Sequence, residues 1–335
     1  MPIVSNPTEG DVHVNVPLTT FAQKILLNAS MFVGMNAVPN APSAKEADLY
    51  FEFNSGDFLR DEAEERADGT ESAGSGFRLS TNPYYCRTYA FHKDVTDRQR
   101  ANQDNVIQLD QSAAQFVTQK LLIRRERVFA NAYMGTGKWT TDMTGVTGTP
   151  AAGQFQFWDE SGSDPVQDIR LAKTTVQGLT GYRPNKMAIG RQALDALMDN
   201  DALLSRITGG ATTAIPALVM RELIAQLFEL DAIYVMDSVY NAKLADATDP
   251  SADDVQFIGS DDALLYYAPD SVGIDEPTAG IQFSWTGYLG ATPSGMRMKR
   301  IRADLKNADR IEGEMSFDYK LTGPDLGYFF SNTVA

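Results

Sequence analysis

The feature that most constrains the fold is a long segment without glycine or proline, running from Asp110 to Met134. Asp110 is a favourable N-cap residue, and a helix over this range is about 36 Å long at 1.5 Å per residue. Apolar residues follow one side of this helix, which predicts burial of Ala113, Val117, Leu121, Val128 and Ala132. The rest of the chain must supply the surfaces that cover the stripe.

The segments before this helix cannot form a core alone. Residues 1–44 read as an arm, in which prolines bracket a short amphipathic segment from Leu18 to Val33. Residues 49–54 alternate between apolar and polar side chains, which is typical of a strand. An acidic stretch from Asp57 to Glu71 then leads to a Gly/Ser-rich tip and to an aromatic strand around Tyr85 to Phe91. The pattern predicts a long two-stranded excursion.

The segments after the helix alternate between helix and strand. Gly135 to Gly153 reads as a Gly/Thr loop, and a helix with proline at its start follows from Pro165 to about Gly178. A compact α/β section is then predicted from a strand over 186–190, a helix over 192–198, a helix over 216–230 and a strand over 232–236.

The C-terminal part reads as strands, which makes the predicted class α+β. The expected strands cover residues 256–259, 263–268, 281–288, 297–305 and 312–321. Alternation is clearest where Met315, Phe317, Tyr319 and Leu321 share one face. In the strand over 297–305, basic residues nearly alternate with apolar ones, and a β-bulge is expected at Lys299–Arg300.

Composition narrows the class of protein. The chain has 335 residues, 43% of them hydrophobic, and a formal charge of −15, which opposes binding of nucleic acid over most of the surface. Cys86 is the single cysteine, so neither an intrachain disulfide nor a cysteine metal cage is expected. The sequence shows no signal peptide or membrane-spanning pattern, so no membrane partner is expected.

In the order of its segments, the chain resembles the HK97-like major capsid proteins of tailed phages. The stretch 89–97, followed by Arg100-Ala101-Asn102 and the helix carrying Glu126, is similar to the passage from extended loop to spine helix in that family. Residues 180–190, with Leu197-Met198 and Ile207, look like the opening of the axial domain. Residues 257–269 with Trp285 resemble its later strands. The resemblance covers essentially the whole chain.

The resemblance implies a domain plan. Residues 1–44 would be the N-arm, 45–100 the extended loop (E-loop) over a neighbouring subunit, and 101–165 the peripheral domain with spine helix 110–134. Residues 166–279 would form the axial domain, and 280–335 the return strands of the peripheral domain. The candidate inter-subunit contacts are the charged residues Asp57, Asp61, Glu62, Glu65, Arg66, Arg78, Lys120, Arg124, Arg127, Arg297, Lys299 and Arg302.

The implied function is a capsid subunit that self-assembles into pentamers and hexamers of an icosahedral head, in the host cytoplasm and then in the virion. The head would enclose dsDNA while contacting it weakly. No lysine occurs from Glu46 through His92, so the Lys-Asn crosslink of some relatives is not expected. Only about 45 residues precede the loop, so a separate scaffolding protein is expected, with a portal and a decoration protein as further candidate partners.

Enzymatic readings have weaker support. His92 and Cys86 lack the partners of a catalytic constellation, and Gly135-Thr136-Gly137-Lys138 departs from the phosphate-loop pattern because Trp139 follows the lysine. Asp253-Asp254 and Asp261-Asp262 lack the spacing of a calcium loop. No cofactor, metal or catalytic residue is therefore expected. The alternatives are an encapsulin-type shell protein with the same fold and, from another class, a soluble metal-dependent α+β enzyme.

Overall fold

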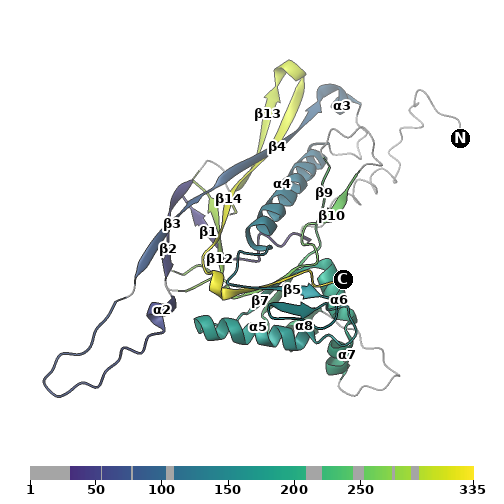
Figure 1. Ribbon diagram of the computed structural model, residues 1–335. Helices are drawn as coiled ribbons and strands as arrows, with labels where there is room; N and C mark the ends of the chain where they lie inside the picture. Colours follow the sequence, from purple (N-terminus) through teal and green to yellow (C-terminus); the bar gives the residue numbers. More distant parts are fainter. Residues whose placement is uncertain are drawn as a thin grey trace.

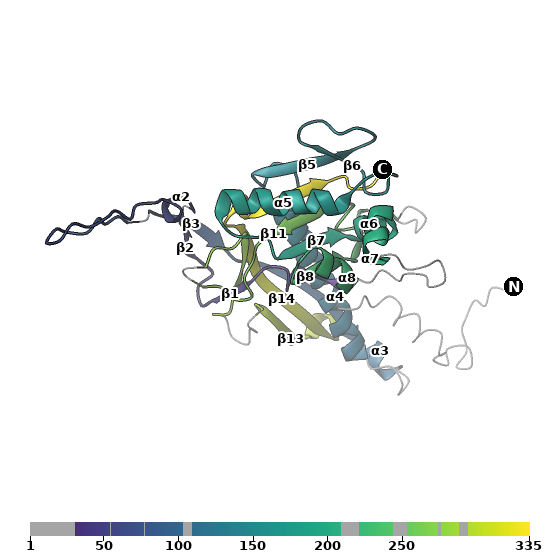
Figure 2. The same ribbon diagram turned by 90° about the horizontal axis from the view of Figure 1, so that it is seen from below.

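The computed structural model describes residues 31–53, 55–76, 78–102, 109–208, 221–243, 253–273, 276–287 and 294–335. Two sheets meet around one long helix, and a narrow loop projects from the body (Figures 1 and 2). The mixture of helices and sheets confirms the α+β class. No described helix is long and apolar enough to cross a membrane. The expected segment from Leu18 to Val33 lies almost wholly outside the described residues.

The long helix, α4, covers Leu109–Tyr133 and confirms the predicted spine-like element. Asp110 lies in its first turn rather than at a cap. The predicted stripe is right at Ala113, Val117 and Leu121 but wrong further along, where Val128 and Ala132 are only partly buried. There the buried face consists of Arg125, Glu126, Phe129, Ala130 and Tyr133. The pattern of apolar residues could not show this turn of the face, because Arg125 and Glu126 are charged.

The first sheet is built around β14 (Ala308–Leu321). Its first half pairs with β13 (Met296–Ala303) on one side and β4 (Arg87–Thr96) on the other. Its second half pairs with β12 (Gly280–Trp285), which pairs in turn with β1 (Asn40–Ser43). The β13–β14 register is continuous from Met296↔Met315 to Ala303↔Ala308, so the bulge expected at Lys299–Arg300 is absent.

Helix α4 packs closely on this sheet because of one glycine. A Cβ at Gly313 would lie 2.7 Å from Val117 Cγ1 and 2.8 Å from Leu121 Cδ1. Met315, Phe317 and Tyr319 are buried, which confirms the alternation read from the sequence. A side chain at position 313 would therefore require Val117, Leu121 or Met298 to shift in a closely packed core.

The second sheet has the strand order β6-β5-β15-β11-β7-β8. Strands β7 (Lys186–Gly190) and β8 (Ala232–Met236) match the predicted ranges. Strands β5 (Thr141–Val146) and β6 (Gln154–Gln156) contradict the assignment of 135–153 to a loop. The sequence reading also missed β15 (Gly327–Ser331), which pairs with β11 (Ala263–Tyr266) in the middle of the sheet.

Helices cover one face of this second sheet. They are α5 (Pro165–Thr180), α6 (Arg191–Asp199), α7 (Asp201–Thr208) and α8 (Arg221–Leu227). The first two confirm expected helices, α7 was not predicted, and α8 matches the described part of the helix expected over 216–230. Proline at the start of α5 and the N-cap bond from Gln167 N to Asp164 explain where that helix begins.

The second sheet separates two hydrophobic clusters. Met187, Ile189 and Leu265 face the helices α5–α8, whereas Ala188, Leu264 and Tyr266 face α4 and the first sheet. All four residues of β11 are buried, as expected for a strand covered on both faces. Helix α4 therefore lies in a core shared by both sheets. The second sheet combines strands from three of the expected regions, so its topology does not test where one region ends and the next begins. The domain limits at 44, 100, 165 and 279 therefore stay predictions.

The end of the expected arm belongs to this core. Phe32, Val33, Ala37 and Val38 are buried, and β1 extends the first sheet by parallel pairing with β12. We call residues 31–43 the strap. It passes between α4 and both sheets, where Tyr266 Oη donates a hydrogen bond to Ala37 O at 2.6 Å.

The predicted two-stranded excursion is confirmed as a ribbon of β2 (Ala47–Phe53) and β3 (Leu79–Tyr85). The short helix α2 (Ser55–Phe58) and an acidic loop join the two strands (Figures 1 and 2). The chain changes its pairing partner at Cys86. The N–H of Cys86 still donates to Glu46 O, and the residues that follow enter β4. The ribbon therefore forms its own two-stranded sheet.

Short elements complete the described fold. Strands β9 (Val239–Asn241) and β10 (Val255–Phe257) form a separate pair, and α3 (Asp97–Ala101) follows β4. The 3-10 turns are η3 (Asp304–Lys306) at the β13–β14 tip and η4 (Pro324–Leu326) before β15.

Candidate inter-subunit surfaces

The ribbon exposes an apolar face. Leu49 is 60% exposed, Phe51 58% and Tyr85 54%. The opposite face is anchored, because Tyr84 stacks on Phe283 of β12 with ring centroids 4.2 Å apart, and Ser43 Oγ lies 2.6 Å from Tyr84 Oη. A thin ribbon with one bare apolar face and open strand edges is suited to being covered by another chain.

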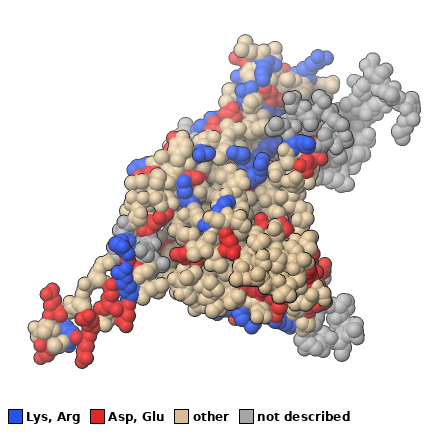
Figure 3. All heavy atoms as spheres, viewed as in Figure 1, with Lys and Arg blue, Asp and Glu red and all other residues tan. Residues whose placement is uncertain are grey.

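The acidic loop is braced at its base and exposed along its length. Arg78 donates to both Asp57 oxygens at 3.1 Å, and Arg60 Nη2 lies 3.1 Å from Asp57 Oδ1. The hydrogen bond from Arg78 lowers the pKa of Asp57 to about 2. Beyond this base, acidic side chains stand in solvent on the projecting loop (Figure 3). They are Asp61, Glu62, Glu64, Glu65, Asp68 and Glu71.

The sequence-predicted loop residues therefore fall into two groups. Asp57 and Arg78 contact each other at the base and hold the two limbs together. Arg66 Nε donates to Thr70 O at 2.5 Å within the loop tip. Asp61 and Glu65 form no ion pair in the described residues. Of these candidate residues, Asp61 and Glu65 are therefore the ones whose carboxylates are available to bind another molecule.

Helix α4 and β4 present a group of cations that rest on aromatic rings. Lys93 and Lys120 lie 5.2 and 5.4 Å from the ring centre of Phe116. Arg124 lies 4.9 Å from the Tyr89 ring and Arg127 4.4 Å from the Tyr240 ring. We call Lys93, Lys120, Arg124 and Arg127 the cationic stripe. Figure 3 shows basic side chains gathered over this part of the molecule.

The basic residues of β13 are paired within the chain. Arg297 Nε and Lys299 Nζ each lie 2.5 Å from a Glu314 carboxylate oxygen. Because β13 is an edge of the first sheet, these charges also discourage pairing with further strands. The structure thus gives Arg297 and Lys299 internal partners, and their expected role between subunits stays a prediction.

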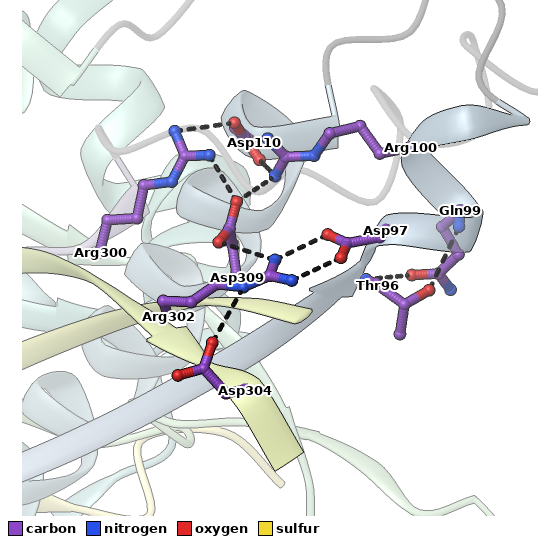
Figure 4. A network of polar contacts seen from close by, with 9 residues as sticks. All are labelled: Thr96, Asp97, Gln99, Arg100, Asp110, Arg300, Arg302, Asp304 and Asp309. Atoms are coloured by element: carbon purple, nitrogen blue, oxygen red, sulfur yellow. Dashed lines mark hydrogen bonds and ion pairs between the residues drawn. The ribbon is translucent and has the colours of Figure 1, made fainter. Parts of the chain in front are cut away.

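Arg302 belongs to a dense ionic network at the tip of this sheet (Figure 4). Asp309 forms ion pairs with Arg300 at 2.5 Å, Arg100 at 3.0 Å and Arg302 at 3.3 Å. Arg100 also contacts Asp110 at 2.8 Å, and Arg302 contacts Asp97 at 2.5 Å. The network joins β13, β14, α3 and the start of α4. It holds η3 at the end of a braced hairpin, where Leu305 is fully exposed.

Sequence reasoning missed a polar cluster inside the core. Glu126 accepts hydrogen bonds from Gly34 N at 2.8 Å and Val33 N at 3.2 Å, and burial raises its pKa to about 7. Arg125 donates to Tyr319 Oη at 3.1 Å, and Tyr319 Oη donates to Gly34 O at 2.6 Å. The signal was present as two charged residues in line with the apolar stripe of α4.

The other residues considered for catalysis or metal binding lie in surroundings that suit a structural role. Cys86 is fully buried, and burial raises the pKa of its thiol to about 12, which disfavours the reactive thiolate. Among the described residues, no group of three His, Cys, Asp or Glu side chains could hold a metal ion. Lys138, beside the Gly/Thr turn, donates to Asn131 O at the end of α4.

Comparison with known proteins identifies phage relatives. The chain is 28% identical over 238 residues to the major capsid protein of Burkholderia phage BcepMu, covering 69% of each protein. It is 26% identical over 178 residues to the major capsid protein of Pseudomonas phage JBD67, covering 53% of each. The sequence matches no family model.

Solved structures share the fold across nearly the whole chain. A phage-related protein from Bordetella bronchiseptica superposes with a TM-score of 0.67 at 18% identity, covering 95% of this chain and 96% of that one. The capsid protein of cyanophage P-SCSP1u gives 0.53 at 12% identity, covering 89% and 86%. The SrpI encapsulin of Synechococcus elongatus gives 0.51 at 10% identity, covering 89% and 85%.

The fold is therefore that of HK97-like shell proteins, a class that includes phage capsid proteins and an encapsulin. Within this class, the sequence relatives are phage major capsid proteins, which confirms the resemblance to the major capsid proteins of tailed phages. These relatives are structural proteins rather than enzymes, and they indicate the virion capsid as the location of this chain.

Proposed function

We propose that copies of this chain assemble into pentamers and hexamers that close an icosahedral phage head around dsDNA. The supporting observation is the ribbon, whose apolar side chains Leu49, Phe51 and Tyr85 are more than half exposed. Burying this face against a neighbour would remove apolar surface from water at every repeat of the shell. Many modest contacts of this kind add up when each subunit binds several others.

The proposal gives each surface a role. The ribbon and acidic loop lie over a neighbouring subunit, and the section containing α5–α8 meets its equivalents at capsomer centres. The charged contact candidates act between subunits, with Asp57 and Arg78 shaping the loop base and Arg302 stiffening the β13–β14 tip. A separate scaffolding protein and a portal complete assembly, and packaged DNA is contacted weakly because the chain carries a charge of −15.

Electron microscopy tests this function. Purified protein and infected-cell lysate should contain icosahedral particles, and the particles from lysate should hold DNA. Particles filled with an enzyme instead of DNA would favour the encapsulin alternative, which shares the fold. A small uniform oligomer under all assembly conditions would overturn both shell readings.

A further inference from the structure

The strap enters the core as a turn rather than as a strand. Within residues 33–37, Asn36 N and Ala37 N both donate hydrogen bonds to Val33 O at 2.9 Å. Strand pairing within the strap begins at Asn40, where β1 joins β12. A segment without ladder hydrogen bonds can open locally while the strands and helices around it stay folded. The groups that hold this turn therefore decide whether the strap stays closed.

Polar side chains from three elements hold the backbone of the turn. Glu126 of α4 accepts hydrogen bonds from two consecutive strap N–H groups, one on each carboxyl oxygen. Tyr319 of β14 donates to Gly34 O at 2.6 Å. Tyr266 of β11 donates to Ala37 O, also at 2.6 Å. The two tyrosines bind carbonyl groups, so Glu126 is the side chain that holds the N–H groups at the start of the turn.

Glu126 is also the group at this turn that titrates near neutral pH. The strap itself contains no ionisable side chain. Arg125, the neighbour of Glu126 on α4, donates to Tyr319 Oη and keeps its charge throughout. Burial raises the pKa of Tyr319 to about 12 and the pKa values of Tyr266 and Tyr133 well above their usual range, so these phenols stay neutral.

The closed core favours the neutral form of Glu126. Its side chain is 1% exposed, and burial raises its pKa to about 7 from the usual 4.5 of a glutamate. A carboxylate in this place lacks hydration, which the two strap N–H groups and Arg125 do not fully replace. When the turn moves away from α4, water reaches the carboxylate and this cost disappears.

Apolar packing opposes the opening of the strap. Phe32, Val33, Ala37 and Val38 are buried, so an open strap exposes apolar surface to water. The open state is therefore a minor population, and the charge of Glu126 changes how large that population is.

From these contacts we infer that the strap is a proton-controlled latch: the turn at residues 33–37 is held against α4 while Glu126 is protonated, and it opens more often once Glu126 ionises. The closed state binds the proton more tightly than the open state. Opening is therefore rarest below pH 4.5 and increases as pH rises through 7. Mildly alkaline conditions release a segment of the core while the rest of the chain stays folded.

Hydrogen exchange of the unassembled chain, read by mass spectrometry, tests the latch. After correction for the intrinsic pH dependence of amide exchange, the protection of peptides covering residues 31–39 should fall about 50-fold between pH 5 and pH 8. Peptides from β11 should exchange more slowly than the strap at pH 8, because their amides are exposed only when the second sheet unfolds.

Two variants separate the proton from the hydrogen bonds. In Glu126→Gln, the protection of the strap should stay within about threefold between pH 5 and pH 8, because the titrating group is gone. Tyr266→Phe is the matched control, since it removes the bond to Ala37 O and leaves Glu126 in place. It should increase opening about five- to tenfold at every pH and keep the pH dependence of wild type.

A direct measurement on the wild-type chain covers the case in which Glu126→Gln does not fold. The amide proton of Gly34 donates to Glu126, so its NMR chemical shift should titrate with the same midpoint as strap protection. The latch is overturned when wild-type protection does not change with pH, when Glu126→Gln keeps the wild-type dependence, or when the shift of Gly34 does not titrate. Strap and β11 peptides with equal protection at every pH would also overturn it, because the strap would then open only by global unfolding.

Discussion

At the scale of single residues, Glu126 shows how polar groups are used inside the core. Its carboxylate is 1% exposed and satisfies two backbone N–H groups of the strap, which enters the core without regular structure at that point. Gly34 allows the close approach, because a Cβ there would lie 3.0 Å from Glu126 Oε2 and 3.1 Å from Phe129 Cβ. The buried carboxylate thus positions the strap against α4.

The titration of Glu126 predicts a pH effect on stability. Burial raises its pKa to about 7 from the usual 4.5 of a glutamate, so the folded state binds a proton more tightly than the unfolded state. The stability that Glu126 contributes to the folded state is therefore fully present below pH 4.5 and is lost as pH rises through 7. The free energy of unfolding changes by about 3 kcal/mol over this range. Urea unfolding of the unassembled chain at pH 5 and pH 8 measures this.

Glu126→Gln supplies the comparison, because it removes the titrating group. The difference in unfolding free energy between wild type and Glu126→Gln should favour wild type more strongly at pH 5 than at pH 8. Acids whose pKa is lowered, such as Asp57, change stability with pH in the opposite direction. Their contribution is the same in both chains and cancels in the comparison. Equal pH dependence in both chains would show that Glu126 does not titrate as described.

At the scale of elements, the β13–β14 hairpin depends on the ionic network at its tip. Asp309 contacts three arginines, and the hydrogen bond from Arg300 is the main cause of its lowered pKa. Asp309→Asn should therefore lower Tm at low salt, and the difference from wild type should shrink in about 1 M salt as the charges are screened. Differential scanning calorimetry at two salt concentrations is the measurement.

Asp304 is the control for this network. It is 89% exposed and, among the residues that the structure describes, forms an ion pair only with Arg302, at 3.5 Å. Asp304→Asn should therefore leave Tm nearly unchanged at either salt concentration. A Tm loss for Asp309→Asn that does not depend on salt would point to packing rather than charge.

The ribbon gives a second prediction for an element. Leu49→Ser/Phe51→Ser should change the unfolding free energy by no more than about 0.5 kcal/mol, because both side chains are exposed, and should lower the fraction of protein in shells. Phe283→Ala, on the anchored side, should instead destabilise the chain by about 3–5 kcal/mol. Denaturation and sedimentation measure the two effects, and normal assembly of the serine variant would contradict the role of this face.

At the scale of the whole molecule, the chain provides no loop lysine for a covalent bond between subunits. The nearest lysines are Lys45, which lies 2.7 Å from Asp48, and Lys93, which rests on Phe116. Mature particles boiled in detergent should therefore run as one band at the mass of the single chain. A ladder of heat-stable multimers would disprove the non-covalent assembly.

Several elements could be predicted because their sequence patterns are local. Alternation in β14, the apolar runs of β7 and β8, the proline at the start of α5 and the acidic loop depend on neighbouring residues, and each was predicted. The ordered resemblance to capsid proteins added the class. Strand β15 was missed because its burial on both faces comes from partners far along the chain, and β5 because glycine and threonine look like a loop.

Which charged side chains are paired within the described chain depends on long-range packing and not on the local sequence. Arg124, Arg125 and Glu126 are consecutive in sequence, yet Arg124 lies on the surface while the other two are buried beneath the strap. Arg302 and Lys120 were equivalent candidates, but within the described ranges the fold supplies carboxylates to the first and only a ring to the second. Long-range packing sets the distance between charges, and that distance determines whether a cation is satisfied within the chain.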